Sequence, residues 1–141
     1  MSIEESTFAE YFDICDLEFD EWNNIDGLEV KPVFSPHPVE TNILFFRTLW
    51  EDGYSTYAHL ADVSSHDVLN KMLEENKKKP GISKKLKTKV WNDYLTPVQV
   101  KKIDIGGGII HGKAKDFKND KSDKITPTSV TSGKSCPLVT S

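Results

Sequence analysis

The sequence predicts an α+β protein built on a small, curled, three-stranded antiparallel sheet that a C-terminal helix covers. Three observations lead to this fold class. Residues 41–63 carry β-branched, aromatic and aliphatic residues on both sides of Glu51-Asp52-Gly53, which is typical of a hairpin. A capped helix with an apolar stripe follows that hairpin directly. An alternating stretch from Trp22 to Phe34 supplies the remaining strand.

Residues 1–19 are acidic, and residues 7–19 within them predict an amphipathic helix. Thr7 and Glu10 fit a capping box, in which each side chain satisfies an unpaired backbone amide. The apolar residues recur at helical spacing, with two more widening the same face: Phe8, Phe12, Cys15 and Phe19, then Tyr11 and Ile14. We expect this helix to pack on its own domain, and docking against a partner is the alternative.

Residues 20–79 form the central module. Asp26-Gly27 predicts a turn within the first strand region, and the prolines of Ser35-Pro36-His37-Pro38 predict a loop before the hairpin. Ser64 opens the helix, and Pro80-Gly81 ends it. Its apolar stripe consists of Val68, Leu69, Met72 and Leu73. The stripe is wider than one small sheet needs, so part of it is available to a second copy of the chain; complete burial within one chain is the alternative.

The sequence beyond Gly81 has weaker patterns. Residues 80–115 form a basic segment, with a short helix over residues 83–95 and two short strands about Gly106-Gly107-Gly108. From residue 116 to residue 141 the sequence is rich in Lys, Ser and Thr and poor in apolar residues, which predicts a disordered tail.

Charge is divided sharply between the two halves. Residues 1–76 contain three basic and seventeen acidic residues, a net charge of −14, whereas residues 77–141 contain fifteen lysines and five aspartates, a net charge of +10. This division suggests that the two halves contact different partners. The candidate nucleic-acid-binding residues are Lys84, Lys85, Lys87, Lys89, Trp91, Lys101 and Lys102. A solubilising basic segment is the alternative.

Sequence spacing indicates no cofactor, metal site or catalytic group. The four histidines have no ligand spacing, and the two cysteines, Cys15 and Cys136, are far apart. Residues 107–114 approach a phosphate-binding loop, but Ala114 replaces the required hydroxyl and no apolar helix follows. No apolar run is long enough to cross a bilayer, and the acidic N-terminus lacks the features of a secretory signal. We therefore expect a non-enzymatic intracellular protein with no membrane contact.

Residues 20–78 resemble the chromo shadow domain of the heterochromatin-protein-one family. The residues that carry the resemblance are Trp22, the alternating Leu28 and Val30, the run ILFFRTLWEDG, the stretch Tyr57-Ala58-His59-Leu60 and the helix SHDVLNKMLEEN. The helix departs from the family in starting with Ser64-Ser65-His66 instead of a Cys-Pro pair.

The resemblance implies a chromo-like sheet and a nuclear, chromatin-associated adaptor. Such a module dimerises through its helix, here Val68, Leu69, Met72, Leu73 and Asn76, and binds extended peptides with a Pro-x-Val-x-Leu pattern. Trp22, Trp50 and Tyr57 belong to its core or its groove. Two alternatives remain open. One is a small nucleic-acid-binding protein with an acidic regulatory half, and the other is a small α+β enzyme whose pocket is lined by Trp22, Tyr57 and His59.

Overall fold

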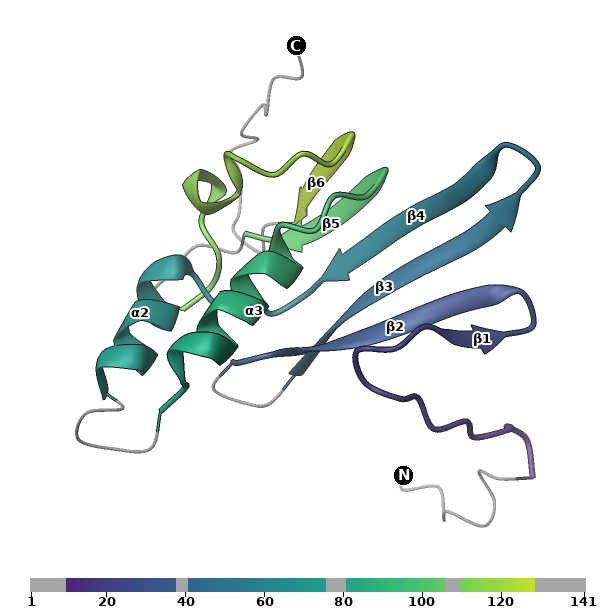
Figure 1. The fold of residues 1–141 in the computed structure, drawn as a ribbon, viewed down its shortest axis with the longest axis horizontal. Coiled ribbons are helices and arrows are strands. Elements are labelled where there is room, and N and C mark those ends of the chain that lie inside the picture. The colour runs from purple at the N-terminus through teal and green to yellow at the C-terminus, as the bar shows by residue number, and fades with distance from the viewer. Residues whose placement is uncertain (1–9, 38–40, 76–80, 106–109, 129–141) are drawn as a thin grey trace.

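The computed structural model describes residues 10–37, 41–75, 81–105 and 110–128 (Figure 1). Within them the chain forms one six-stranded sheet, two α-helices and one 3-10 helix. Their bounds are β1 Asn23–Ile25, β2 Leu28–Ser35, β3 Thr41–Trp50, β4 Gly53–Leu60, α2 His66–Glu75, α3 Lys84–Tyr94, β5 Val100–Asp104, η1 Ala114–Phe117 and β6 Lys124–Thr128.

The sheet is mixed, and its strands follow chain order from β1 to β6. Strands β1 to β4 pair antiparallel, whereas β5 pairs parallel with β4 and β6 pairs parallel with β5. The crossover from β4 to β5 carries α2 and α3, and the crossover from β5 to β6 carries η1 (Figure 1). A parallel pair needs such a connection because the chain must return to the same end of the sheet.

The turns and caps explain why these elements begin and end where they do. The β1–β2 turn has positive φ at Asp26 (51°) and Gly27 (90°), as a two-residue primed hairpin turn requires. Gly53 opens β4 at a φ of 123°, which side chains rarely tolerate. Helix α3 starts at Ser83, whose side chain accepts a hydrogen bond from the amide of Leu86. Ser65 caps α2 in the same way, accepting from the amide of Val68 at 3.3 Å.

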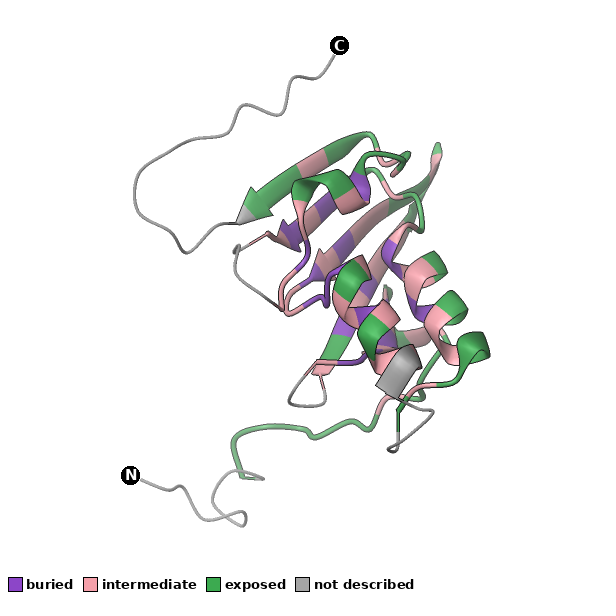
Figure 2. Cartoon of the chain, turned by 90° about the vertical axis from the view of Figure 1, so that its left-hand side faces the viewer, coloured by how far each residue is buried: buried purple, intermediate pink, exposed green. Residues whose placement is uncertain are grey.

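The core lies between the helices and one face of the sheet, which we call the front face. Register places Phe45, Ala58 and Lys101 side by side on this face. The buried apolar residues of the core come from strands, loops and both helices: Val33, Ile43, Phe45, Ala58, Leu60, Val63, Leu69, Val90, Tyr94, Ile103 and Phe117. Figure 2 shows these buried bands on the strands beneath the helices.

The opposite face, which we call the back face, is apolar at its centre. One cross-strand row runs Val30–Phe46–Tyr57–Val100. Leu28, Phe46, Tyr57 and Val100 line an open groove of about 490 Å³ on this face. Neither α-helix covers it, because both pack on the front face.

The predicted three-stranded sheet covered by one C-terminal helix is wrong. The sheet has six strands and two helices cover it, although the β3–β4 hairpin, its turn and both helices form where the sequence predicts them. The short segment around β5 has no strong local strand signal because its partners, β4 and β6, lie far away in sequence and pair in parallel. The two strands predicted about Gly106-Gly107-Gly108 do not pair as a hairpin in the described residues, and the glycines themselves lie outside them.

The predicted N-terminal helix is also wrong over residues 10–19, which have no helical structure. Four of its apolar side chains are more than half exposed: Tyr11 75%, Phe12 57%, Ile14 66% and Phe19 52%. A short helix is marginal in water without a surface to pack against, and these side chains stay largely exposed. Residues 1–9 lie outside the described part of the chain.

The disordered tail predicted from residue 116 is corrected as far as residue 128. Phe117 is buried, and β6 adds to the sheet with Ile125 packed against the core. These few apolar contacts are enough because parallel pairing with β5 also satisfies the backbone of β6. The rest of the predicted tail, residues 129–141, lies outside the described residues.

Candidate metal site

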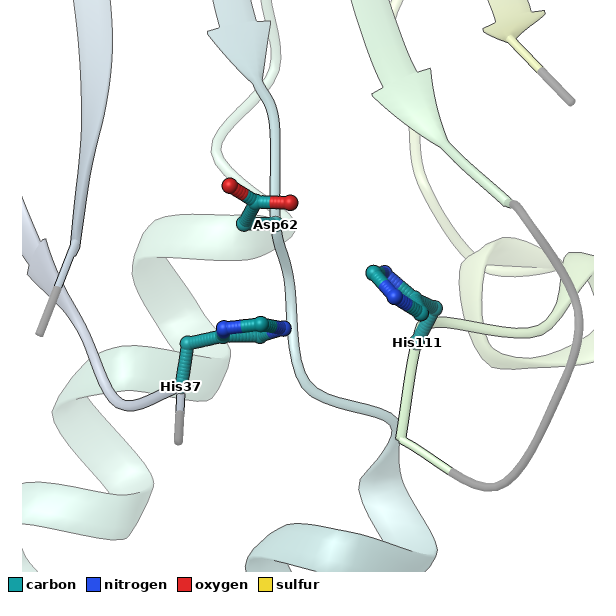
Figure 3. A group of neighbouring side chains, drawn as sticks. All are labelled: His37, Asp62 and His111. Carbon is teal, nitrogen blue, oxygen red and sulfur yellow. The ribbon is translucent and has the colours of Figure 1, made fainter. Parts of the chain in front are cut away.

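Two histidines and an aspartate converge at one edge of the sheet. His37, Asp62 and His111 each offer a potential ligand atom, and these three atoms all lie within 4.8 Å of one another. Figure 3 shows the two imidazole rings pointing toward one another, with the carboxylate of Asp62 beside the gap between them. The ring centroids are 5.3 Å apart. Two imidazoles and a carboxylate form a donor set that zinc and related transition metals prefer.

The sheet topology brings these three residues together. His37 follows β2, Asp62 follows β4 and His111 lies beyond β5. Strands β2 and β4 both run antiparallel to β3, and β5 runs parallel to β4, so these three strands point the same way. Their carboxyl ends therefore meet at the same edge, although the residues are far apart in sequence.

A buried serine joins the three segments that carry the ligands. The hydroxyl of Ser64 donates a hydrogen bond to the carbonyl of Pro36, next to His37, and Ser64 also forms a β-bridge with His111. The amide of Gly112 donates to the carbonyl of Val63 at 2.9 Å, which extends this bridge. Ser64 is fully buried, so water does not compete for its hydrogen bonds.

Tyr94 of α3 braces the same segments from the front face. Its hydroxyl lies 2.6 Å from the hydroxyl of Ser35 and accepts a hydrogen bond from the amide of Ser64 at 3.4 Å. Ser35 stands two residues before His37, and Ser64 two residues after Asp62. Burial raises the pKa of Tyr94, which keeps its hydroxyl neutral. The strand ends that carry His37 and Asp62 are thus tied to one helix side chain.

Three buried polar atoms at this edge have no hydrogen-bond partner within the described part of the chain. They are Nε2 of His37, Nδ1 of His111 and Oδ1 of Asp104. The other carboxylate oxygen of Asp104 lies 3.4 Å from Nδ1 of His111. Buried polar atoms are nearly always satisfied in folded proteins, so their clustering here indicates a site made to interact with something else.

The backbone at Asp62 is unusual. Its φ is 53°, in the left-handed region that few non-glycine residues adopt. Such a conformation costs about 1–3 kcal/mol and is concentrated at functional sites. At Asp62 it turns the chain between the end of β4 and the buried Ser64, where the carboxylate meets the two histidines.

The structure distributes the predicted dimer or partner residues over both sides of α2. Leu69 is fully buried in the core, whereas Val68, Met72 and Leu73 are partly exposed. Asn76 lies outside the described residues. Three of the four described residues are therefore partly accessible, although Met72 also packs against the core, and Leu69 does not contribute to a surface.

The three aromatic residues predicted for a core or a groove do not converge. Trp22 packs against the core on the front face, and the guanidinium of Arg47 lies 4.0 Å from the centre of its ring. Trp50 is 62% exposed near the tip of the β3–β4 hairpin. Tyr57 lines the back-face groove, with its hydroxyl 3.0 Å from Nδ1 of His59. The pocket predicted for Trp22, Tyr57 and His59 is thus divided between two faces.

The predicted nucleic-acid-binding residues do not form one surface. Lys84 and Lys85 are exposed, and Lys102 lies on the back face. Lys87 donates to Asn70, and Lys89 pairs with Asp20 and Asp93 at 2.6 and 2.8 Å.

The two remaining members of this set, Trp91 and Lys101, are partly and fully buried. Trp91 packs against His66, with ring centroids 4.7 Å apart. Lys101 is fully buried, pairs with Asp120 and donates to the carbonyl of Tyr94 at 3.0 Å. An exposed phosphate therefore cannot reach Lys101.

The sequence reasoning missed the cluster of His37, Asp62 and His111 because no local spacing links them. A usable signal was present, since His37 lies in the loop predicted after the first strand and Asp62 near the end of the last predicted strand. Without the parallel pairing of β5, however, nothing places His111 beside them.

No protein-family model matches this chain, and no curated protein matches it either. The resemblance to the chromo shadow domain therefore stays a prediction. Neither helix within the described residues has the length and apolar character needed to cross a membrane.

Proposed function

We propose that this chain binds a divalent transition-metal ion of the zinc class through His37, Asp62 and His111. The observation that carries the proposal is the convergence of three potential ligands, one of which, the buried Nε2 of His37, has no hydrogen-bond partner in the described residues. Three protein ligands leave a coordination position for water, which is typical of catalytic zinc sites. The reaction class that fits such a site is hydrolysis by a metal-activated water.

The ligands need only a small movement to reach metal-binding distances. Three atoms at the upper limit of 4.8 Å from one another would each lie about 2.8 Å from a central ion, whereas zinc bonds to nitrogen and oxygen are about 2.0–2.2 Å long. Each ligand atom therefore has to approach by about 0.7 Å at most, a movement on the scale of a small χ rotation. His37 and Asp62 follow strand ends, so such rotations leave the sheet unchanged.

Asp104 supports this proposal from behind His111. Metal-ligating histidines usually donate their second ring nitrogen to a carboxylate, which fixes the tautomer. Nδ1 of His111 faces Asp104 at 3.4 Å, so Nε2 is the atom left for the metal. With Nδ1 protonated, this pair supplies a partner for one of the three atoms that otherwise lack one, Nδ1 of His111.

Isothermal titration of the full-length protein with zinc chloride tests this proposal. We expect one tight site in the wild type, and its loss in His37→Gln and in His111→Gln. Asp104→Asn should retain the site with an affinity about 10- to 100-fold lower, the usual effect of removing an orienting carboxylate. His59→Gln is the matched control, because His59 lies on the back face away from the cluster. If the tight site survives in both ligand variants, the proposal is wrong.

A second measurement addresses the reaction class. The zinc-loaded wild type should release p-nitrophenol from an ester or a phosphodiester, and His111→Gln treated identically should not. Zinc binding without such release would support the metal site and remove the hydrolytic function.

The chromatin adaptor, the homodimer, the peptide partners, the contact with nucleic acid and the nuclear location stay predictions from the sequence. Sedimentation of the full-length chain at high micromolar concentration is the direct measurement for the dimer.

A further inference from the structure

We propose that residues 10–19 dock across the back-face groove of the same chain, as an acidic apolar strap over the centre of the sheet. This inference is independent of the metal site. It joins two features of the fold: an open apolar groove on the back face and an N-terminal segment whose apolar side chains are largely exposed.

The groove presents apolar surface that an isolated domain normally covers. Leu28 and Val100 are each 39% exposed, and Phe46 and Tyr57 lie between them as its floor. Trp50 stands on the same face, fixed by a hydrogen bond from its indole nitrogen to the hydroxyl of Thr48 at 2.8 Å. A contiguous apolar patch on a soluble domain usually marks a contact surface.

The N-terminal segment has the chemistry that this surface accepts. Its exposed aromatic and aliphatic side chains match the apolar floor. Residues 10–19 also carry four carboxylates and no basic group. On the back face, Lys102 pairs with His59, and Lys124 pairs with Val100, so both lysines lie on the β5–β6 side of the groove. An acidic segment across the groove would therefore meet lysines beyond the apolar floor.

The segment is tethered next to the groove. The side chain of Asn23 accepts a hydrogen bond from the amide of Glu18 at 2.8 Å and donates to its carbonyl at 2.9 Å. Asn23 pairs with Val30, so the tether begins in the same cross-strand row as Phe46, Tyr57 and Val100. Figure 2 shows the described N-terminal segment leaving toward the side away from the two helices.

The segment is also long enough. Three strand spacings separate β1 from β4, about 14 Å. Residues 10–17, which precede the tether, span about 26 Å when extended but only about 12 Å as a helix, so the strap crosses the groove in an extended form. A tether this short gives an effective concentration in the millimolar range, which favours the chain's own segment over a second copy at micromolar concentration.

Paramagnetic NMR tests the strap directly. Cys15 is exposed, so a nitroxide can be attached there in the ¹⁵N-labelled full-length chain carrying Cys136→Ser. We expect the amides of Phe46, Tyr57 and Val100 to lose most of their signal, and those of α2 to keep theirs. Unaffected groove amides would overturn the proposal.

Three variants and one mixture decide what occupies the groove. Ile14→Ser should restore the groove signals by removing an apolar anchor, and Ile14→Leu should leave them broadened. Lys102→Glu should restore them in part, while unchanged front-face signals report that the fold is intact. A mixture can also be prepared in which one chain carries the nitroxide but no ¹⁵N, and the other carries ¹⁵N but no nitroxide. In that mixture the ¹⁵N signals of the groove should be unaffected. Broadening in that mixture would identify a second copy as the occupant and overturn the strap.

Discussion

The ion pair between Lys101 and Asp120 allows a quantitative test of the fold. Both side chains are completely buried, and they join β5 to the connection that leads into β6. Burial lowers the pKa of Lys101, while the bond to Asp120 opposes that change. The informative perturbation is Lys101→Met, which keeps most of the side-chain volume and removes the charge.

The expected cost follows from what each variant leaves behind. In Lys101→Met the carboxylate of Asp120 stays buried without its counterion, which costs about 3–5 kcal/mol of unfolding free energy. Asp120→Leu strands the ammonium of Lys101 and should cost a similar amount. The double variant leaves no buried charge, but the amide of Ser122 and the carbonyl of Tyr94 lose their partners. We expect a cost of about 1–3 kcal/mol for it.

Urea unfolding followed by circular dichroism measures these differences. With an m-value of about 2 kcal/mol/M, each single variant should lower the midpoint by about 2 M, and the double variant by less than either. If each single variant costs under about 1 kcal/mol, the pair is not desolvated. Lys101 would then reach solvent and rejoin the candidate nucleic-acid-binding residues.

Three further predictions concern side chains around the sheet. The Arg47 guanidinium donates two hydrogen bonds to Glu29 and holds the pKa of Glu29 below its usual value, so this stabilisation is present above about pH 4 and disappears as pH falls through the lowered folded pKa. In urea titrations the stability difference between wild type and Arg47→Met should therefore shrink from pH 7 to pH 3. An equal difference at both pH values would refute this prediction. Tyr94→Phe removes the hydroxyl bonded to Ser35, so urea unfolding should show a loss of about 1–3 kcal/mol in unfolding free energy. Calorimetry should also show weaker zinc binding, and an unchanged zinc affinity would argue against the bracing role of Tyr94. In Gly112→Ala the new Cβ would lie 3.0 Å from the side chains of Phe117 and Val63, which are both buried. Thermal melts should therefore show a loss of about 1–3 kcal/mol in unfolding free energy, whereas an unchanged stability would mean that this packing can adjust.

The sequence was most informative where structure is local. The β3–β4 hairpin is readable because its strands pair across the short Glu51-Asp52 turn, and α3 is readable because Ser83 caps it. Strand β5 is not readable in the same way. Its buried face carries Lys101 beside Ile103. A lysine next to another lysine in the sequence indicates a solvent-exposed position unless its buried counterion is known.

The amphipathic stripe of residues 7–19 illustrates the opposite error. Its spacing is a true property of the segment, but spacing alone does not supply the surface that stabilises a short helix. The described residues of this segment are exposed instead. The stripe is thus better interpreted as a sign of an interaction than of a helix, and the proposed strap is such an interaction.

The proposed metal site and the parallel half of the sheet would stabilise one another. An ion held by His37, Asp62 and His111 would link β2, β4 and the chain beyond β5, the same segments that Ser64 joins through Pro36 and His111. Such an ion binds the native state and not the unfolded chain, so at a free concentration of 100 times its Kd it adds about 2.7 kcal/mol to the unfolding free energy. Strands β4 and β5 are connected by a long crossover that contains α2 and α3. A metal ion bound to Asp62 and His111 would join the two segments at the ends of these strands. A metal ion here would thus stabilise the topology that brings its own ligands together. Tyr94→Phe loosens that topology without changing a ligand, so it should lower both the stability of the fold and the affinity for the metal.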